Sequence, residues 1–246
     1  MPAQTRESSR VLVVVAHPDD ESFGCGSVIA EAVARGHTVE VCCASLGELG
    51  EVAPGYDLAG RSLGEVRHGE LLGAAAVLGA DVLEPLGLRD SGWDGPAAPE
   101  SICGLDAGDL AERVAAVLAE RGPDVVVTLA GDDGHRDHRR LDEAVTAAVL
   151  ARPGVRLYRW CLPNDLMRRW AEEMTELRPD TAHLALELAE LGTPAERVTT
   201  VLDCSAHLGL RRKAIAAHAS QTSPYEGLSP DLADAFLSAD HLIRVV

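Results

Sequence analysis

The sequence has few aromatic residues and little positive charge. Phe, Trp and Tyr make up only 3% of its 246 residues, so the chain offers few rings on which nucleobases could stack. Asp and Glu outnumber Lys and Arg by 39 to 22, which gives a formal net charge of -17. Because like charges repel, we expect neither nucleic acid nor an anionic membrane as a partner. A neutral or cationic small molecule fits better.

Long apolar runs and paired cysteines are also missing. A membrane-spanning helix needs about 20 consecutive apolar residues, and charges interrupt the alanine-rich segments here. Residues 1–10 are polar and lack the apolar stretch of a signal peptide, so we expect a flexible N-terminal tail on a soluble, cytoplasmic protein. The six cysteines show no C-x-x-C spacing, which favours reduced core residues over a disulfide or a thiolate zinc site.

What the chain does contain is an alternation of strand and helix patterns in one domain, residues 11–246. Strands are expected at 11–16, 38–44, 81–86, 124–129, 155–162, 198–202 and 241–246, and helices at 24–34, 61–78, 110–121, 141–149 and 206–219. This pattern predicts an α/β fold, Rossmann-like, with a mostly parallel, doubly wound sheet and helices on both faces. Residues 163–196 are charged and helical, typical of an insertion, and the loop 87–108 is expected to rim the site.

The first chemical motif, Ala16-His17-Pro18-Asp19-Asp20-Glu21, directly follows the first buried strand. Ligands of open α/β sheets bind at the carboxyl ends of strands, so side chains here are well placed for a site. Pro18 restricts His17 to extended geometry, which lets His17 and Asp20 converge while Asp19 projects separately.

The second motif, residues 131–138, follows the strand at 124–129 and ends in His135-Arg136-Asp137-His138. Residues three apart at a helix start share a face, so His135 and His138 can address one point. His17, Asp20 and His138 would form a site of two histidines and one carboxylate. Such a set suits zinc or Fe²⁺ better than Mg²⁺ or Ca²⁺ and leaves a coordination position for water.

Plainer interpretations exist for the motif residues and for two other candidates, Arg67 and Asp90. The Asp residues after His17 could serve merely as caps of the following helix. Glu21 is better interpreted as a helix cap or as a residue that orients a metal ligand than as a ligand itself. Arg67 could pair with a carboxylate across its helix, and Asp90 could cap a turn. The scattered histidines have no clustered partners, so surface or core positions are expected for His37, His68, His183, His207 and His241.

Across most of its length the chain resembles the metal-dependent de-N-acetylases of the LmbE and PIG-L type. The resemblance is carried by residues 16–21 and 135–138, with support from Ser45-Leu46-Gly47-Glu48, Arg67-His68-Gly69-Glu70-Leu71, Arg89-Asp90-Ser91-Gly92 and His218-Ala219-Ser220-Gln221. It implies that His17, Asp20 and His138 bind zinc, that Asp19 is the general base, and that His135 stabilises the oxyanion, if protonated, or donates a proton. It also implies substrate contacts for Arg67, Asp90 and Glu48.

Two positions depart from this family. Related thiol-cofactor deacetylases often carry a tyrosine where this chain has Asp133. If that tyrosine helps to hold the oxyanion, this chain either lacks the contact or supplies it from another residue. Arg136 replaces a usual proline, which should alter the stiffness of the loop more than metal ligation.

The resemblance implies a zinc-dependent hydrolase that removes an N-acetyl group from an amino sugar or glycoside in small-molecule or natural-product metabolism. Two alternatives stay open: an amidase of larger acyl groups, as in thiol S-conjugates, and a noncatalytic sugar-binding or scaffold protein. A phosphoesterase is remote, because no Gly-rich phosphate loop is present. The sequence leaves the substrate, the native metal and assembly into a homo-oligomer open.

Overall fold

Seven strands form one sheet in the computed structural model, which describes residues 8–186 and 191–246. The strands are β1 (Arg10–Val15), β2 (Thr38–Cys43), β3 (Asp81–Val82), β4 (Val125–Leu129), β5 (Arg156–Cys161), β6 (Thr200–Asp203) and β7 (Ala239–Arg244). Their order is β3-β2-β1-β4-β5-β7-β6. The first five are parallel, and β7 runs antiparallel to both β5 and β6. The mostly parallel sheet predicted from the alternation is therefore confirmed.

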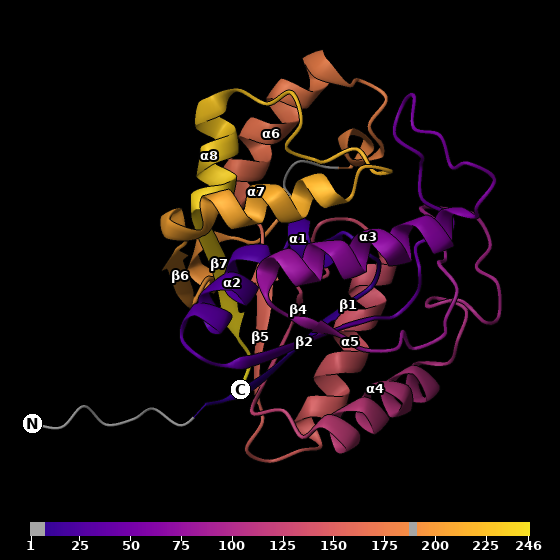
Figure 1. Ribbon diagram of the computed structural model, residues 1–246, viewed down its shortest axis with the longest axis vertical. Helices are drawn as coiled ribbons and strands as arrows, with labels where there is room; N and C mark the ends of the chain where they lie inside the picture. Colours follow the sequence, from indigo (N-terminus) through magenta and orange to yellow (C-terminus); the bar gives the residue numbers. More distant parts are fainter. Residues whose placement is uncertain (1–7, 187–190) are drawn as a thin grey trace, which may run out of the picture.

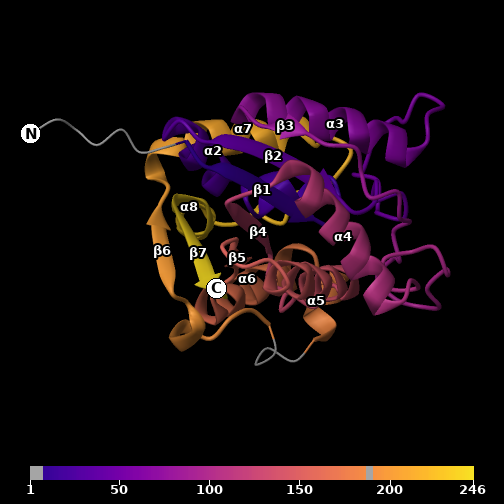
Figure 2. The ribbon, with the colours of Figure 1, turned by 90° about the horizontal axis from the view of Figure 1, so that it is seen from below.

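The helices divide between the two faces of this sheet, as Figure 2 shows. They are α1 (Asp20–Phe23), α2 (Gly26–Ala34), α3 (Leu63–Leu78), α4 (Ala107–Arg121), α5 (Arg136–Leu150), α6 (Asn164–Leu177), α7 (Leu208–Ala217) and α8 (Pro230–Ser238), with short 3-10 turns at Ala182–Ala185, Ala195–Arg197 and Ser205–His207. Helices α2, α3 and α7 cover one face, and α4 and α5 cover the other.

The β1 sequence explains why both faces are covered. Its side chains alternate between faces, as in any strand. Val11, Val13 and Val15 pack with α2, α3 and α7, whereas Leu12 and Val14 pack with α4 and α5. A strand that is apolar at every position needs cover on both sides, which is the pattern of a central parallel strand.

The sheet changes winding direction between β1 and β4. The chain leaves β1 towards β2 on one side, and it leaves β4 towards β5 on the other. Connections that diverge from two adjacent parallel strands leave a crevice at their carboxyl ends, the usual ligand position in doubly wound sheets. Both motifs singled out in the sequence follow these two strands directly.

Several boundaries differ from the sequence predictions. Strand β1 begins at Arg10, so the predicted tail 1–10 is one residue too long, and residues 1–7 lie outside the described residues. The helix expected at 24–34 begins two residues later, as α2 at Gly26, and the short helix α1 before it was not predicted. Strand β3 has two residues where six were expected, and α8 was not predicted.

The expected insertion at 163–196 is helical at α6 and packs against α8 (Figure 1). Met167, Trp170 and Met174 of α6 share an apolar cluster with Leu232 and Phe236 of α8. Residues 187–190 of the insertion lie outside the described residues. The buried residues of this cluster belong to neither of the two clusters that cover the sheet. Its helix α8 therefore has no partner in the strand-and-helix alternation, and the sequence did not indicate it.

Two predictions from composition concern membranes and cysteines. Among helices in residues 8–186 and 191–246, none is long and apolar enough to cross a bilayer. All six cysteines are free thiols, and five of them are buried, as expected: Cys25, Cys42, Cys43, Cys161 and Cys204. Cys103 is the exception, since it is half-buried and its Sγ donates a hydrogen bond to Asp137.

Candidate metal and catalytic site

The turn after β1 places three acidic or basic side chains at the crevice. His17 and Asp20 are buried, and the His17 amide donates a hydrogen bond to Asp20 Oδ2 over 2.9 Å. Asp19 between them has a φ of 107°, a region that side-chain-bearing residues rarely occupy. Such strain persists only where surrounding contacts impose it, and here the Asp19 amide donates to Glu21 Oε2. The turn therefore aims Asp19 and Asp20 in different directions, as the motif predicted.

The start of α5 supplies the other two histidines. His135 precedes the helix with extended backbone, and its Nδ1 accepts a hydrogen bond from the Asp137 amide over 3.2 Å. His138 lies one turn along, and the two rings stack with centroids 4.6 Å apart. An N-terminal side chain that caps its own helix is held in one rotamer. The local sequence thus fixes both rings on the same side of α5.

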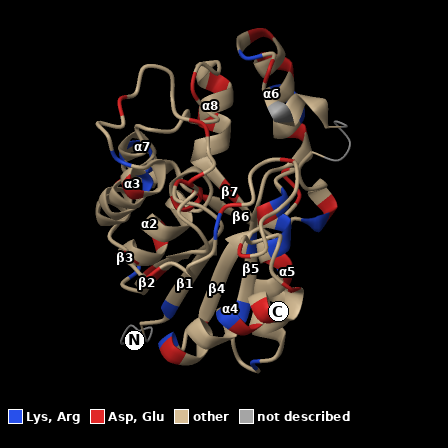
Figure 3. Cartoon of the chain, turned by 90° about the vertical axis from the view of Figure 1, so that its right-hand side faces the viewer, with Lys and Arg blue, Asp and Glu red and all other residues tan. Residues whose placement is uncertain are grey.

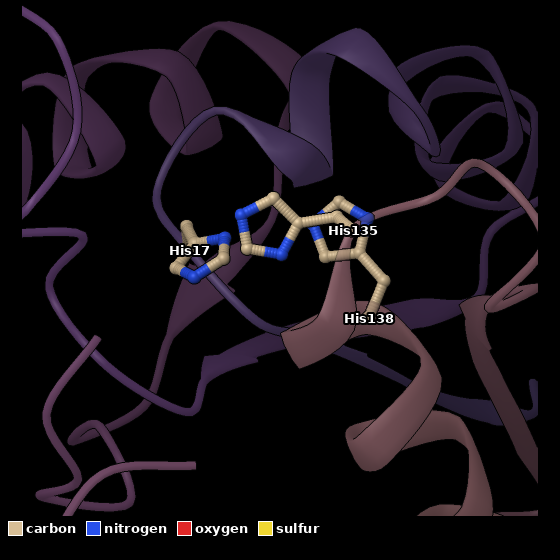
Figure 4. Close-up of side chains that lie close together, drawn as sticks. All are labelled: His17, His135 and His138. Carbon is tan, nitrogen blue, oxygen red and sulfur yellow. The ribbon is translucent and has the colours of Figure 1, made fainter. Parts of the chain in front are cut away.

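Three imidazoles from these two segments gather at one point, as Figure 4 shows. The His17 centroid lies 4.9 Å from that of His135 and 5.5 Å from that of His138. One ring nitrogen of each lies within 4.8 Å of the other two, close enough to hold one metal ion. Asp20 joins them, with Oδ2 3.6 Å from His17 Nδ1 and Oδ1 3.3 Å from His138 Nε2.

The fold therefore brings together the predicted ligands and the predicted catalytic His135. Which of the four groups ligate the metal stays a prediction, because His135 meets the same distance criterion as the two histidines expected to ligate. A second group also meets it, formed by His17 and the carboxylates of Asp90 and Asp137, which lie 3.7 and 3.3 Å from His17 Nε2.

The donor set fits a metal ion on two observations. Among the described residues, His138 Nε2 is buried and forms no well-aligned hydrogen bond, and its near neighbour, Asp20 Oδ1 at 3.3 Å, is itself a predicted ligand. Two of the histidines also have a carboxylate beside a ring nitrogen: Asp133 Oδ2 lies 2.5 Å from His138 Nδ1, and Asp137 Oδ2 lies 3.3 Å from His17 Nε2. Carboxylate, histidine and metal in this sequence is the usual arrangement that orients a ligating ring.

The charges around the histidines are strongly coupled. Burial alone would raise the pKa of Asp20, but the nearby His138 and His17 hold it well below its usual range. Burial likewise opposes the charge on Asp137, yet hydrogen bonds with His17, Cys103 and Ser91 hold its pKa low. Burial would lower the pKa of His138, but Asp133 and Asp20 raise it well above the ordinary value. The site thus collects negative charge that favours a cation.

Asp19 is the carboxylate with the opposite shift. Burial raises its pKa to about 6, although Arg67 pulls it down. Arg67 Nη2 lies 3.1 Å from Asp19 Oδ2, and the same guanidinium donates to the carbonyls of Gly47 and Pro18. Arg67 is 4% exposed, so its described contacts are with protein groups next to Asp19. A direct substrate contact of Arg67 stays a prediction.

The pKa of His135 bears on the role expected for it. Burial, together with the positive charges of His138 and His17, lowers its pKa to about 3, which disfavours the protonated form near neutral pH. Because Nδ1 accepts the Asp137 amide, the proton of the neutral ring lies on Nε2. The uncharged His135 ring can therefore donate a hydrogen bond from Nε2. This hydrogen bond is weaker than one from a protonated ring but still suits a developing oxyanion.

Asp90 and Glu48 lie beside the site but are engaged by backbone groups. Asp90 accepts hydrogen bonds from the amides of Leu49 and Gly92, and its Oδ1 is 3.7 Å from His17 Nε2. Glu48 Oε1 accepts from the Asp90 amide. The turn-capping interpretation of Asp90 is thus correct for these contacts, and substrate contacts of both residues stay predictions.

Sequence reasoning missed the supporting carboxylates. Asp137 was visible in the second motif, but only the fold shows that its fully buried carboxylate turns to His17, 120 residues away. Asp133 was noted only for the tyrosine that it replaces. Behind Asp19, Glu21 Oε1 lies 2.7 Å from His218 Nε2 with both side chains fully buried. The resemblance marked His218, whereas no spacing signal connects it to Glu21.

Comparison with known proteins was consistent with this geometry. Residues 12–149 match the PIG-L family, described as GlcNAc-PI de-N-acetylase. A 1D-myo-inositol 2-acetamido-2-deoxy-alpha-D-glucopyranoside deacetylase from Actinosynnema mirum is 36% identical, with 95% of this chain and 91% of the relative covered. A teicoplanin deacetylase, solved in a zinc-inhibited form, has 17% identity and a TM-score of 0.64 over 96% of this chain and 98% of that one.

The same fold also occurs in a protein with a different printed activity. GalB, a 4-carboxy-2-hydroxymuconate hydratase from Pseudomonas putida KT2440, has 21% identity and a TM-score of 0.63, with 97% of this chain and 96% of that one covered. At such identities the structural matches speak for the fold alone. Function has to be argued from the family, the sequence relatives and the side chains of the site.

Proposed function

The chain belongs to the PIG-L family of GlcNAc-PI de-N-acetylases, and on that premise we propose that it hydrolyses the N-acetyl group of an amino-sugar glycoside. The observation that carries the proposal is the cluster of His17, His135 and His138 beside two carboxylates with separate orientations. One carboxylate, Asp20, contacts the histidines, and the other, Asp19, is paired with Arg67. A binding protein has no need of this second carboxylate.

The ion that we propose for the cluster is Zn²⁺, with Fe²⁺ as the second candidate. His17, Asp20 and His138 would hold it, and it would supply Lewis acidity that lowers the pKa of a bound water towards neutrality. Support comes from the buried His138 Nε2 and from the carboxylates behind His17 and His138. The related fold in a zinc-inhibited deacetylase makes it necessary to test the two ions separately and at stoichiometric amounts.

Asp19 would act as the general base. Arg67 binds Oδ2, which leaves Oδ1 to take a proton from the attacking water. The carbonyl carbon gains the water oxygen, the C–N bond breaks, and the proton held on Asp19 passes to the departing amine. Acetic acid and an amine result, and the acid gives up its remaining proton to leave acetate. Base catalysis of this kind is worth roughly 10²- to 10⁴-fold in rate.

His135 would hold the carbonyl oxygen as negative charge develops on it. Its Nε2 hydrogen is directed by the hydrogen bond that Nδ1 accepts, so the donor needs no rearrangement during the reaction. Asp133 would not take over any oxyanion contact of the tyrosine that related deacetylases often carry at this position, because its carboxylate accepts from His138 and from the His135 amide. An acceptor-only carboxylate would repel an oxyanion.

The test is a deacetylation assay with the metal-reconstituted protein. The first substrate is 1D-myo-inositol 2-acetamido-2-deoxy-alpha-D-glucopyranoside, followed by simple N-acetylhexosamines and by amides with bulky acyl groups. We expect acetate release from the acetylated glycosides. Cleavage only of the bulky amides would replace the proposal with the amidase alternative, and no turnover on any amide would favour a noncatalytic scaffold.

Two variants separate the proposed roles. His17→Ala should lose metal, whereas Asp19→Ala should keep metal and lose roughly 10²- to 10⁴-fold in kcat. Metal content is measured by elemental analysis on the same samples as the rates. A variant of Asp19 that retains wild-type kcat would contradict the base assignment.

A further inference from the structure

Arg136, the first residue of α5, binds a turn of the loop between β3 and α4. Its Nε donates to the carbonyl of Gly92 and its Nη1 to that of Gly95, both over 2.7 Å. Its Nη2 donates to the carbonyls of Asp94, over 2.9 Å, and Ser91. Four carbonyls of one five-residue turn therefore converge on a single guanidinium. Figure 3 shows this basic start of α5 against a chain rich in acidic residues.

The turn held in this way carries Trp93, which contacts His135 of the histidine cluster. The Trp93 ring meets the His135 ring edge to face, with centroids 5.3 Å apart, and lies 4.5 Å from the His183 ring on the neighbouring 3-10 turn. A Cβ on Gly134 would come within 3.9 Å of Trp93 and collide with Leu186. Trp93 therefore contacts His135, and Leu186 from a second loop lies against the residue that precedes it.

We propose that Arg136 is a positioning residue that holds Trp93 against His135, and that Trp93 held there limits the size of the acyl group that the site accepts. The second part rests on the proposed function. Trp93 touches His135, the residue proposed to bind the scissile carbonyl oxygen, so a larger acyl group on that carbonyl would collide with Trp93. Trp is large and its ring is fixed by two aromatic neighbours, so a longer acyl chain cannot displace it without breaking those contacts.

Arg136→Pro tests the first part with little risk to the fold. The residue occupies the first position of the helix, where proline is favoured because the missing N–H has no helical partner there. The preceding residue, His135, already has the extended backbone that a following proline requires, with φ of -77° and ψ of 124°. Arg136→Lys is the second variant, since one ammonium with three donors cannot serve four carbonyls. Arg140→Ala is the matched control, because Arg140 binds the same loop at Leu105, away from Trp93.

The first readout is the accessibility of Trp93, measured by acrylamide quenching of fluorescence with Trp93→Phe as the reference that isolates its signal. The other two tryptophans, Trp160 and Trp170, are buried. We expect quenching to rise in Arg136→Pro and Arg136→Lys and to stay at the wild-type level in Arg140→Ala. Unchanged quenching in both Arg136 variants, or an equal rise in the control, would overturn the positioning role.

The second readout is acyl selectivity, the ratio of kcat/KM for N-butyryl and N-acetyl forms of one amino sugar. Trp93→Ala should raise this ratio roughly tenfold or more, as expected for a pocket that loses a wall. Arg136→Pro should raise it in the same direction, and Arg140→Ala should not. An unchanged ratio in Trp93→Ala, or a change only when the amine-side group is varied, would overturn the acyl-size role.

The two readouts separate this inference from the proposed function. If the wild type hydrolyses no amide, the proposed function fails and the acyl-size role fails with it. The quenching measurement still decides whether Arg136 positions Trp93, because it needs neither metal nor substrate.

Discussion

Asp133 should control how tightly the site binds metal. Its two carboxylate oxygens are both in use: Oδ1 accepts from the His135 amide over 3.0 Å, and Oδ2 accepts from His138 Nδ1 over 2.5 Å. Asn offers one acceptor oxygen, so Asp133→Asn must give up one of the two hydrogen bonds, along with the charge. Either loss loosens a ring of the histidine cluster.

The magnitude follows from the class of interaction. Removing the partner behind a ligating histidine typically costs about 10- to 100-fold in metal affinity. That range corresponds to about 1.4 to 2.8 kcal/mol of binding free energy. We expect Asp133→Asn to weaken Zn²⁺ binding by this amount, measured by competition with a fluorescent chelator.

Asp132→Asn is the matched control for this measurement. Asp132 is the adjacent carboxylate, but it accepts a hydrogen bond from Thr193 Oγ1 and faces away from the histidines in this contact. It should bind Zn²⁺ as the wild type does. Equal affinities for wild type and Asp133→Asn, or an equal loss in both variants, would refute the assignment of Asp133 as the partner that orients His138.

Three further results are expected. Burial would lower the pKa of His218, but Glu21 raises it, so this histidine stabilises the fold below its unfolded pKa of about 6.5 and the contribution is lost as pH rises through the folded pKa. His218→Gln should therefore lower the free energy of unfolding more at pH 6 than at pH 9, measured by urea denaturation of the metal-free protein. Equal losses at the two pH values would contradict this. Gly79→Ala should lower the free energy of unfolding by about 1 to 2 kcal/mol, because Gly79 ends α3 with φ of 80° and a Cβ there meets Val33 at 3.0 Å. Gly73→Ala is the control in the same urea denaturation experiment: it lies within the same helix with open space around it and should not lower the free energy of unfolding. With a net charge of -17, kcat/KM for a cationic substrate should fall as salt rises, and equal rates for cationic and anionic substrates at low salt would remove this steering effect.

The order of elements could be predicted from local pattern because each signal depends on near neighbours. Continuous apolar runs such as Val11–Val15 indicate a strand covered on both faces, and Gly79 marks a helix end because it tolerates a left-handed backbone. Strand β3 and helix α8 were misjudged, since both depend on packing partners distant in the chain.

The residue types of the site were also visible in the sequence, because a motif states which groups follow a strand. His17, Asp19, Asp20, His135 and His138 all lie at the crevice where the two motifs predicted them. Their orientation was not visible. Asp137 turns to His17, Asp133 to His138 and Arg67 to Asp19, across gaps that no sequence spacing encodes.

The sequence by itself thus determined the fold class, the two strand ends that carry chemistry and the family, because these follow from periodicity, turn residues and short motifs. Only the tertiary structure decided which carboxylate lies against which histidine, that burial lowers the pKa of His135, and that Arg136 binds the turn whose Trp93 contacts His135. The physical reason is that hydrogen bonds and burial act over a few ångströms in space, and the chain separations involved, 44 residues for Arg136 and Gly92 and 120 for His17 and Asp137, leave no local trace.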